Sequence, residues 1–160
     1  MKRKTNIKPI SNVEGIEWDA DLHIDKANPS EVTNRYWLHA HRKSGKYPKP
    51  TVRSGKWLVF VDKEDVDMVW SKIKKTVEEG MLGSDAKVAT AKSNPHATDA
   101  STKVICVYTY DHADEEDVRR IRAELRKLGI TNRIPYKTDE DTLSGKYRIT
   151  GHTRISKYFE

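Results

Sequence analysis

Two amphipathic helical segments, separated by pairs of β-rich segments, are the feature that most constrains the fold of this chain. Apolar residues between Val66 and Val77, and again between Val118 and Leu128, recur at the three- and four-residue spacing of one helix face. Expected strands lie at residues 36–41, 56–61, 87–91, 104–110, 132–137 and 146–149. Because this order is not a strict β-α-β alternation, the sequence predicts an α+β fold with a mostly antiparallel sheet and helices on one face.

The domain organisation follows from the length and from the uneven periodicity. The 160 residues suit one domain. Residues 1–34 show no sustained period, so we expect an N-terminal arm that is partly mobile, and residues 35–160 form a single α+β domain. Cys106 is the only cysteine, so no disulfide framework or cysteine zinc cluster forms, which favours a cytoplasmic protein. The sequence contains neither a membrane-spanning apolar run nor a secretory leader pattern, so no membrane partner is expected.

The charges are arranged in blocks. The chain has 30 lysines and arginines against 24 acids, a net charge of +6. No acid occurs between Val32 and Val61, a stretch with seven basic residues, or between Thr142 and Phe159. Acids cluster instead at 62–79, 111–124 and 139–141. If the acidic blocks share one layer, the basic blocks share a face, and such a face attracts phosphorylated ligands.

The first expected strand provides a candidate ligand platform. Trp37, His39 and His41 alternate along it, so all three can line one face, with Arg42 directly after them. An aromatic plane beside imidazoles and a cation suits a base or a phosphorylated ring. The alternative is that Trp37 lies in the core and the histidines are ordinary surface residues. The two histidines could also bind a metal, but no carboxylate pattern completes the site, so neither metal nor cofactor is expected.

Further candidate phosphate-binding groups occur near glycines or strand ends. They are Arg53 and Lys56 beside Gly55, Lys87 and Lys92 around the 87–91 strand, and His152 and Arg154 after Gly151. The 53–56 segment is not a P-loop, which would continue into a helix after Gly-Lys-Ser or Gly-Lys-Thr. We expect Arg53, Lys56 and Arg154 to meet at one rim of the sheet, where arginine suits phosphate. The alternative is that each is a separate, solvated rim cation.

Several strings carry a family resemblance. They are YWLHAHRKSGKYP, RSGKWLVFV, VWSKIKKT, LGSDAKVATAK, KVICVYTYD, DVRRIRAELRKLGI, PYKTDEDTLSGKY and GHTRISKYFE. Together they resemble a family of small bacterial proteins named for a phosphothreonine lyase domain, and a eukaryotic family first named as a basophilic-leukaemia-expressed protein. The resemblance covers about residues 35–160. It implies a fold similar to the mRNA cap-binding initiation factor, with a curved antiparallel sheet and helices on its convex side.

The leading functional hypothesis is a binding module for a nucleotide or single-stranded RNA on a basic sheet face. In this hypothesis Arg42, Lys56 and Arg154 hold phosphate, while Trp37 and His39 contact the base. A cap sandwich is not expected, since two of the four tryptophans fall at core positions, Trp57 in an apolar strand and Trp70 in a helical stripe. Only Trp18 and Trp37 remain available for stacking.

The alternative hypotheses are a phosphate-ester enzyme and a protein-interaction domain whose basic loops meet an acidic partner. Phosphothreonine elimination needs a base, an acid and cations, which Lys56 or Lys87 and His39 or His152 would supply beside an arginine. The bacterial effector lyases carry a Lys-x-His pair on a strand, and this chain has none. The sequence leaves open whether there is turnover, and the ligand, protein partner and oligomeric state are not determined.

Overall fold

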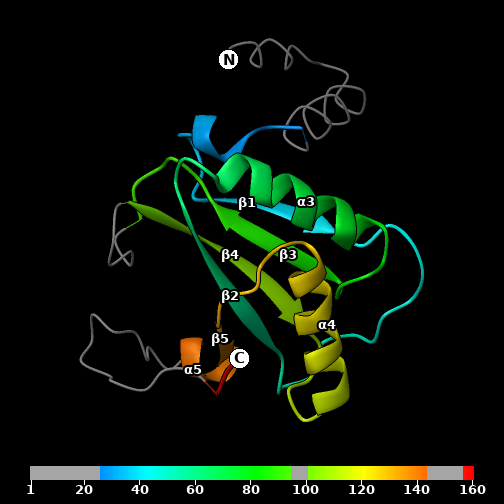
Figure 1. Ribbon diagram of the computed structural model, residues 1–160. Coiled ribbons are helices and arrows are strands. Elements are labelled where there is room, and N and C mark those ends of the chain that lie inside the picture. Colours follow the sequence, from blue (N-terminus) through cyan, green and yellow to red (C-terminus); the bar gives the residue numbers. More distant parts are fainter. Residues whose placement is uncertain (1–25, 95–100, 144–156) are drawn as a thin grey trace, which may run out of the picture.

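An antiparallel sheet with two long helices on one face forms the body of the protein (Figure 1). The computed structural model describes residues 26–94, 101–143 and 157–160. The strands are β1 (Trp37–His41), β2 (Gly55–Asp62), β3 (Asp85–Ala89), β4 (Thr102–Thr109), β5 (Pro135–Thr138) and β6 (Tyr158–Phe159). They lie in the order β1-β3-β4-β2-β5-β6, and each neighbouring pair is antiparallel. The expected α+β class with a curved antiparallel sheet is confirmed.

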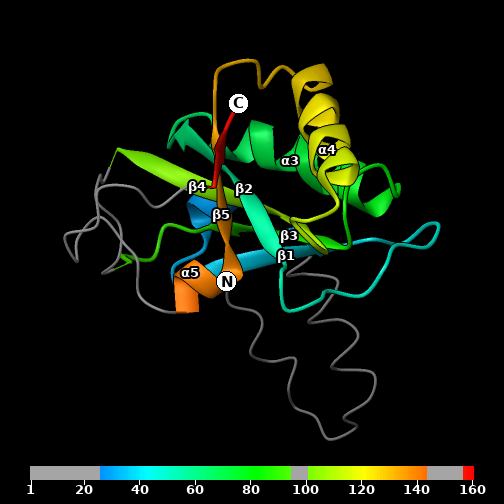
Figure 2. The same cartoon turned by 90° about the horizontal axis from the view of Figure 1, so that it is seen from below.

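The helices lie where the apolar stripes predicted them. Helix α3 (Val66–Glu78) and helix α4 (Glu115–Lys127) cover the same face of the sheet (Figure 2). Helix α4 begins after Asp114, whose side chain accepts a hydrogen bond from the backbone N–H of Asp117, and ends before Gly129, which has a φ of 101°. Among the described residues, no helix has the length and apolarity needed to cross a membrane.

The core lies between the sheet and these two helices. Trp57 of β2 is fully buried, and its indole N–H donates to the carbonyl oxygen of Val118 in α4 at 3.0 Å. Trp70 of α3 is 3 % exposed, so both tryptophans occupy the core positions that the sequence predicted. Cys106 is also buried, and burial raises the pKa of its thiol to about 11.

Strand register determines which side chains face away from α3 and α4. Trp57 and its partner Val107 face the helices, so Lys56 and Leu58 on either side of Trp57 face the opposite side. We call that side of the sheet the open face. Its residues are Trp37, His39 and His41 of β1, Asp85, Lys87 and Ala89 of β3, Val104, Cys106 and Tyr108 of β4, Lys56, Leu58 and Phe60 of β2, and Lys137 of β5.

Two short elements near the carboxyl end were not predicted. A five-residue helix, α5 (Asp139–Leu143), follows β5 directly and lies on the open-face side (Figure 2). Strand β6 pairs with β5. The strand expected at 132–137 begins only at Pro135, and that expected at 87–91 spans Asp85–Ala89. The strand expected at 146–149 lies outside the described residues.

The described end of the expected N-terminal arm packs against the body. A 3₁₀ helix, η1 (Pro29–Glu31), contains the buried Pro29. Ser30 donates hydrogen bonds to Asp67 of α3, and the backbone N–H of Ala91 donates to the carbonyl oxygen of Pro29 at 3.0 Å. Residues from 26 onward therefore pack with the domain that was expected to begin at residue 35. The rest of the arm, including Trp18, lies outside the described residues.

Candidate functional site

Strand β1 presents its tryptophan and two histidines to the open face, as their alternation predicted. Between them, Leu38 and Ala40 are buried against the core. The rings of His39 and His41 are parallel, with centroids 6.2 Å apart. The interpretation of Trp37 as a core residue is therefore wrong, because β1 directs it to the side of the sheet away from the helices.

Lysines from the β3 segment lie over the aromatic rings of the β1 segment. Lys87 Nζ lies 3.9 Å from the centroid of the Trp37 ring, and Lys92 Nζ lies 4.5 Å from that of Tyr36. These distances are those of cation–π contacts. His39 is the register partner of Lys87, so an imidazole, an indole and an ammonium group adjoin one another on this part of the open face.

Burial and nearby positive charge lower the pKa of His39. Burial is the larger cause, followed by repulsion from His41 and Lys87, while Asp85 opposes the shift. The His39 imidazole is therefore neutral near pH 7, and it offers one hydrogen-bond donor and one acceptor. Such a group suits the polar edge of a base, whereas the neighbouring ammonium group of Lys87 suits an anion.

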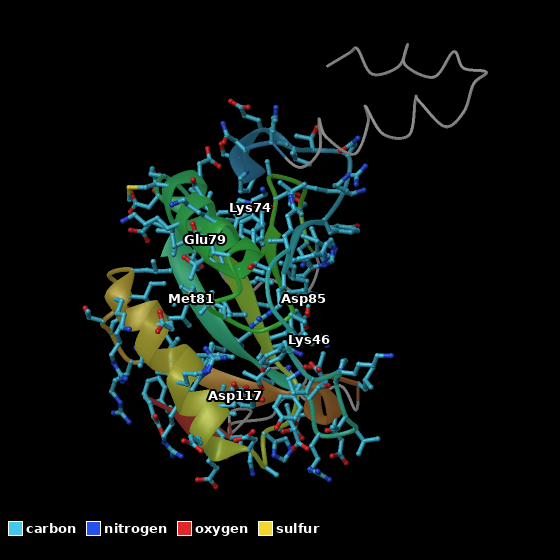
Figure 3. All side chains as sticks on the ribbon, turned by 90° about the vertical axis from the view of Figure 1, so that its right-hand side faces the viewer. Lys46, Lys74, Glu79, Met81, Asp85 and Asp117 are labelled. Atoms are coloured by element: carbon cyan, nitrogen blue, oxygen red, sulfur yellow. The ribbon has the colours of Figure 1, made fainter. Side chains whose placement is uncertain are left out.

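Arg42 was expected to hold phosphate. It instead donates hydrogen bonds to the turn that follows α3. Met81 of this turn is labelled in Figure 3. The Arg42 guanidinium donates to the carbonyl oxygen of Leu82 at 2.6 Å and to those of Gly83, Ser44 and Lys46 at 3.3 Å. Its Cζ atom also lies 5.0 Å from the centroid of the Tyr47 ring. With its donors directed at four carbonyl oxygens, Arg42 is a structural residue.

Arg53 is likewise held by a carboxylate. It makes a two-pronged ion pair with Asp111, with Nε–Oδ1 and Nη2–Oδ2 distances of 2.8 and 2.6 Å. These hydrogen bonds lower the pKa of Asp111 to about 2. Because one acid from the 111–124 block binds a cation of the acid-free stretch, the expectation that the acidic and basic blocks occupy separate faces is wrong here.

Lys56 reaches the open face but is buried and paired. Its Nζ atom lies 2.6 Å from Asp139 Oδ1 and 2.9 Å from Thr142 Oγ1, both in α5. We expected Arg53, Lys56 and Arg154 to meet at one rim of the sheet. This stays a prediction, because Arg154 lies outside the described residues. His152 also lies outside them.

Of the residues named for lyase chemistry, His39 and Lys87 adjoin as register partners, whereas Lys56 lies apart from them. Lys56 and Lys87 lie on β2 and β3, which β4 separates, so their backbones are about 10 Å apart across the sheet. Lys56 is also held by Asp139, with a distance of 2.6 Å between Nζ and Oδ1. Among the described residues, no group of three histidine, cysteine or acidic side chains could hold a metal ion.

Phe60 and Lys137 are among the open-face residues that sequence reasoning did not single out. Phe60 is 52 % exposed, although it lies in a segment that we interpreted as apolar on both faces. Lys137 is only 4 % exposed and is the register partner of Lys56. The period of two from Lys56 to Phe60 was the signal that could have identified Phe60. Lys137 had no comparable signal, because its position depends on the pairing of β5 with β2.

Comparisons with known proteins agree with this architecture. The model of a family described as "Basophilic leukemia-expressed protein Bles03" matches residues 48–142. A Schistosome eIF4E solved with m7GpppG and 4E-BP is similar in structure, with 18 % identity, a TM-score of 0.61, and 92 % of this chain and 81 % of that chain covered. Ascaris suum eIF4E-3 with m7G cap gives 18 % identity, a TM-score of 0.56, and coverages of 90 % and 79 %. Caenorhabditis elegans eIF4E-3 with the 4E-binding protein Mextli gives 21 % identity and a TM-score of 0.56, with 82 % of this chain and 79 % of that chain covered. At these identities the likeness establishes the fold.

Proposed function

This chain belongs to the Bles03 family and has the fold of the eIF4E proteins, and on that premise we propose that it binds a phosphorylated nucleotide or single-stranded RNA on its open face. The observation that supports this most directly is the group formed by Trp37, His39 and Lys87. It combines a ring for stacking, a neutral imidazole for the edge of a base and an ammonium group for phosphate. The structural neighbours were solved with cap nucleotides, which is consistent with a nucleotide ligand for this fold.

The proposed ligand carries no methylated cap. Trp57 and Trp70 are buried and cannot receive a base, and Lys87 lies over one face of Trp37, which leaves only the other face of that ring for a base. Without a second stacking ring opposite Trp37 in the described residues, a methylated guanine gains no advantage over guanine. We therefore expect m7GTP and GTP to bind with the same affinity in a fluorescence titration. A clear preference for m7GTP would contradict the uncapped assignment.

Trp37→Ala should weaken binding of a short RNA by about 1–3 kcal/mol, since it removes one stacking contact. Binding of inorganic phosphate should hardly change, because phosphate has no base to stack. Titrations with both ligands would measure the difference, and Met68→Ala provides the control, since Met68 is 56 % exposed on the helix side of the protein. Equal loss for both ligands would exclude a stacking role for Trp37.

Binding should also depend steeply on salt, as phosphate contacts release counterions. Lys87→Gln should reduce that salt dependence, because it removes one phosphate contact. The absence of any RNA or nucleotide binding at low salt would refute the proposal, and phosphate release from a phosphothreonine peptide would instead favour an enzyme.

The proposed compartment is the cytoplasm, where a buried lone thiol such as that of Cys106 stays reduced.

A further inference from the structure

Two buried lysines stand side by side at the end of the open face that α5 covers. Lys56 of β2 and Lys137 of β5 are register partners and are 7 % and 4 % exposed. Both side chains point to the same side of the sheet, because opposite residues of an antiparallel pair share a face. Burial lowers the pKa of Lys137, repulsion from Lys56 adds to this effect, and the carboxylate of Asp141 in α5 opposes it. A buried pair of like charges needs anionic groups close by.

Helix α5 places a carboxylate at Lys56, the first lysine of this pair. Asp139 Oδ1 accepts from Lys56 Nζ at 2.6 Å, and its other oxygen, Oδ2, accepts from the Ser54 hydroxyl at 2.6 Å. Thr142 Oγ1 also accepts a hydrogen bond from Lys56 Nζ, at 2.9 Å. The oxygens of Asp139 are thus held by an ammonium and a hydroxyl donor, which are donors that a phosphate group also uses.

Apolar packing holds α5 only weakly. It is five residues long, none of its residues is buried, and Leu143 is 88 % exposed. An isolated helix of this length is unstable in water. Its position therefore depends on polar contacts, among them those of Asp139 and Thr142 with Lys56 and those of Asp139 with Ser54.

We propose that Lys56 and Lys137 form a subsite for a terminal phosphate, and that α5 occupies this subsite until the phosphate displaces Asp139. A phosphate monoester carries more negative charge near pH 7 than a carboxylate, so two adjacent ammonium groups favour it. The inference rests on the proposed function and specifies its ligand.

The distance between the stacking ring and the phosphate subsite sets the length of the ligand. Trp37 and Lys56 lie on strands separated by β3 and β4 and are offset along them, which places their Cα atoms roughly 20 Å apart. A trinucleotide spans this distance and a mononucleotide does not, so the ligand is a short single strand with a terminal phosphate.

Asp139→Asn tests the displacement, because it removes the competing charge and preserves the size of the side chain. We expect a trinucleotide with a 5′-phosphate to bind about tenfold more tightly than to the wild type, which is the effect of one charge-assisted contact. The same trinucleotide with a 5′-hydroxyl should bind unchanged, and a 3′-phosphate version shows which end is recognised. Glu140→Gln is the matched control, since it removes one exposed charge from the same helix. It should change all affinities by less than about twofold.

Hydrogen exchange of residues 139–143 provides a second readout on the wild-type chain. Inorganic phosphate should accelerate exchange in α5, and chloride at equal ionic strength should not. Thr142→Val, which removes one hydrogen bond to Lys56 and no charge, should tighten binding of the 5′-phosphate strand by a smaller factor than Asp139→Asn. Thermal melts of both variants show whether the fold is retained.

The outcomes separate this inference from the proposed function. If Asp139→Asn affects the phosphate and hydroxyl strands equally, or if phosphate leaves exchange in α5 unchanged, the inference is wrong even when RNA binds at Trp37. If Trp37→Ala has no effect while Asp139→Asn keeps its selectivity for the 5′-phosphate, the stacking site is wrong and the phosphate subsite stands.

Discussion

Trp57→Ala should lower the free energy of unfolding by about 3–5 kcal/mol, the usual range for truncating a buried aromatic side chain. Trp57 is fully buried, and its ring packs edge-on against Tyr136 with centroids 5.2 Å apart. The substitution opens a cavity between the sheet and α4, and it leaves the carbonyl oxygen of Val118 without the indole donor. Denaturant unfolding, followed by circular dichroism, would measure the loss.

Trp70→Ala should give a loss of the same size, since Trp70 is 3 % exposed in the same core. Trp37→Ala is the matched control, because its side chain lies on the open face, and it should cost less than about 1 kcal/mol. A loss that small for Trp57→Ala or Trp70→Ala would mean that the tryptophan concerned is not in the core.

Arg122→Met should also cost about 3–5 kcal/mol, because it leaves one buried and two partly buried carbonyl oxygens without their charged donor. Arg122 is fully buried on the core side of α4, although it is an arginine. Its guanidinium donates to the backbone carbonyl oxygens of Glu160, Ile130 and Asn132 at 2.9, 2.9 and 2.7 Å. It therefore ties α4 to the segment that follows it and to the strand pair β5–β6.

The control for Arg122→Met is Arg126→Met, one helical turn further along α4, where the side chain is exposed. This control should change stability by no more than about 0.5 kcal/mol. Equal effects of the two substitutions in denaturant unfolding would show that the three carbonyl contacts of Arg122 do not stabilise the fold.

The parts of the fold that the sequence predicted correctly are those with a regular local period. The stripes of α3 and α4 needed only residues three and four apart. The alternation of Trp37, His39 and His41 was enough to place all three on one face, because side chains of a strand alternate whatever its neighbours are. Helix α5 and strand β6 are too short to show a period, so nothing local indicated them.

The partners of the candidate cations could not be predicted from local pattern. Arg53 meets Asp111 and Lys56 meets Asp139, and in each case the two residues belong to segments far apart in sequence. These contacts depend on strand order, which charge blocks do not encode. The acid-free stretch suggested a continuous basic face, but several of its cations are neutralised by acids that the topology brings to them, such as Glu78 beside Lys43.

The strand order also determines when the candidate stacking surface can form during synthesis of the chain. Strand β1 emerges from the ribosome first but pairs with β3, which in turn pairs with β4, so β1 has no neighbour in the sheet until β3 has been made. A nascent chain that ends within α3 therefore holds Trp37 and the two histidines on an unpaired strand, open to chaperones and to misfolding. The candidate ligand platform is therefore translated early but takes up its place in the sheet only after β3 has been made.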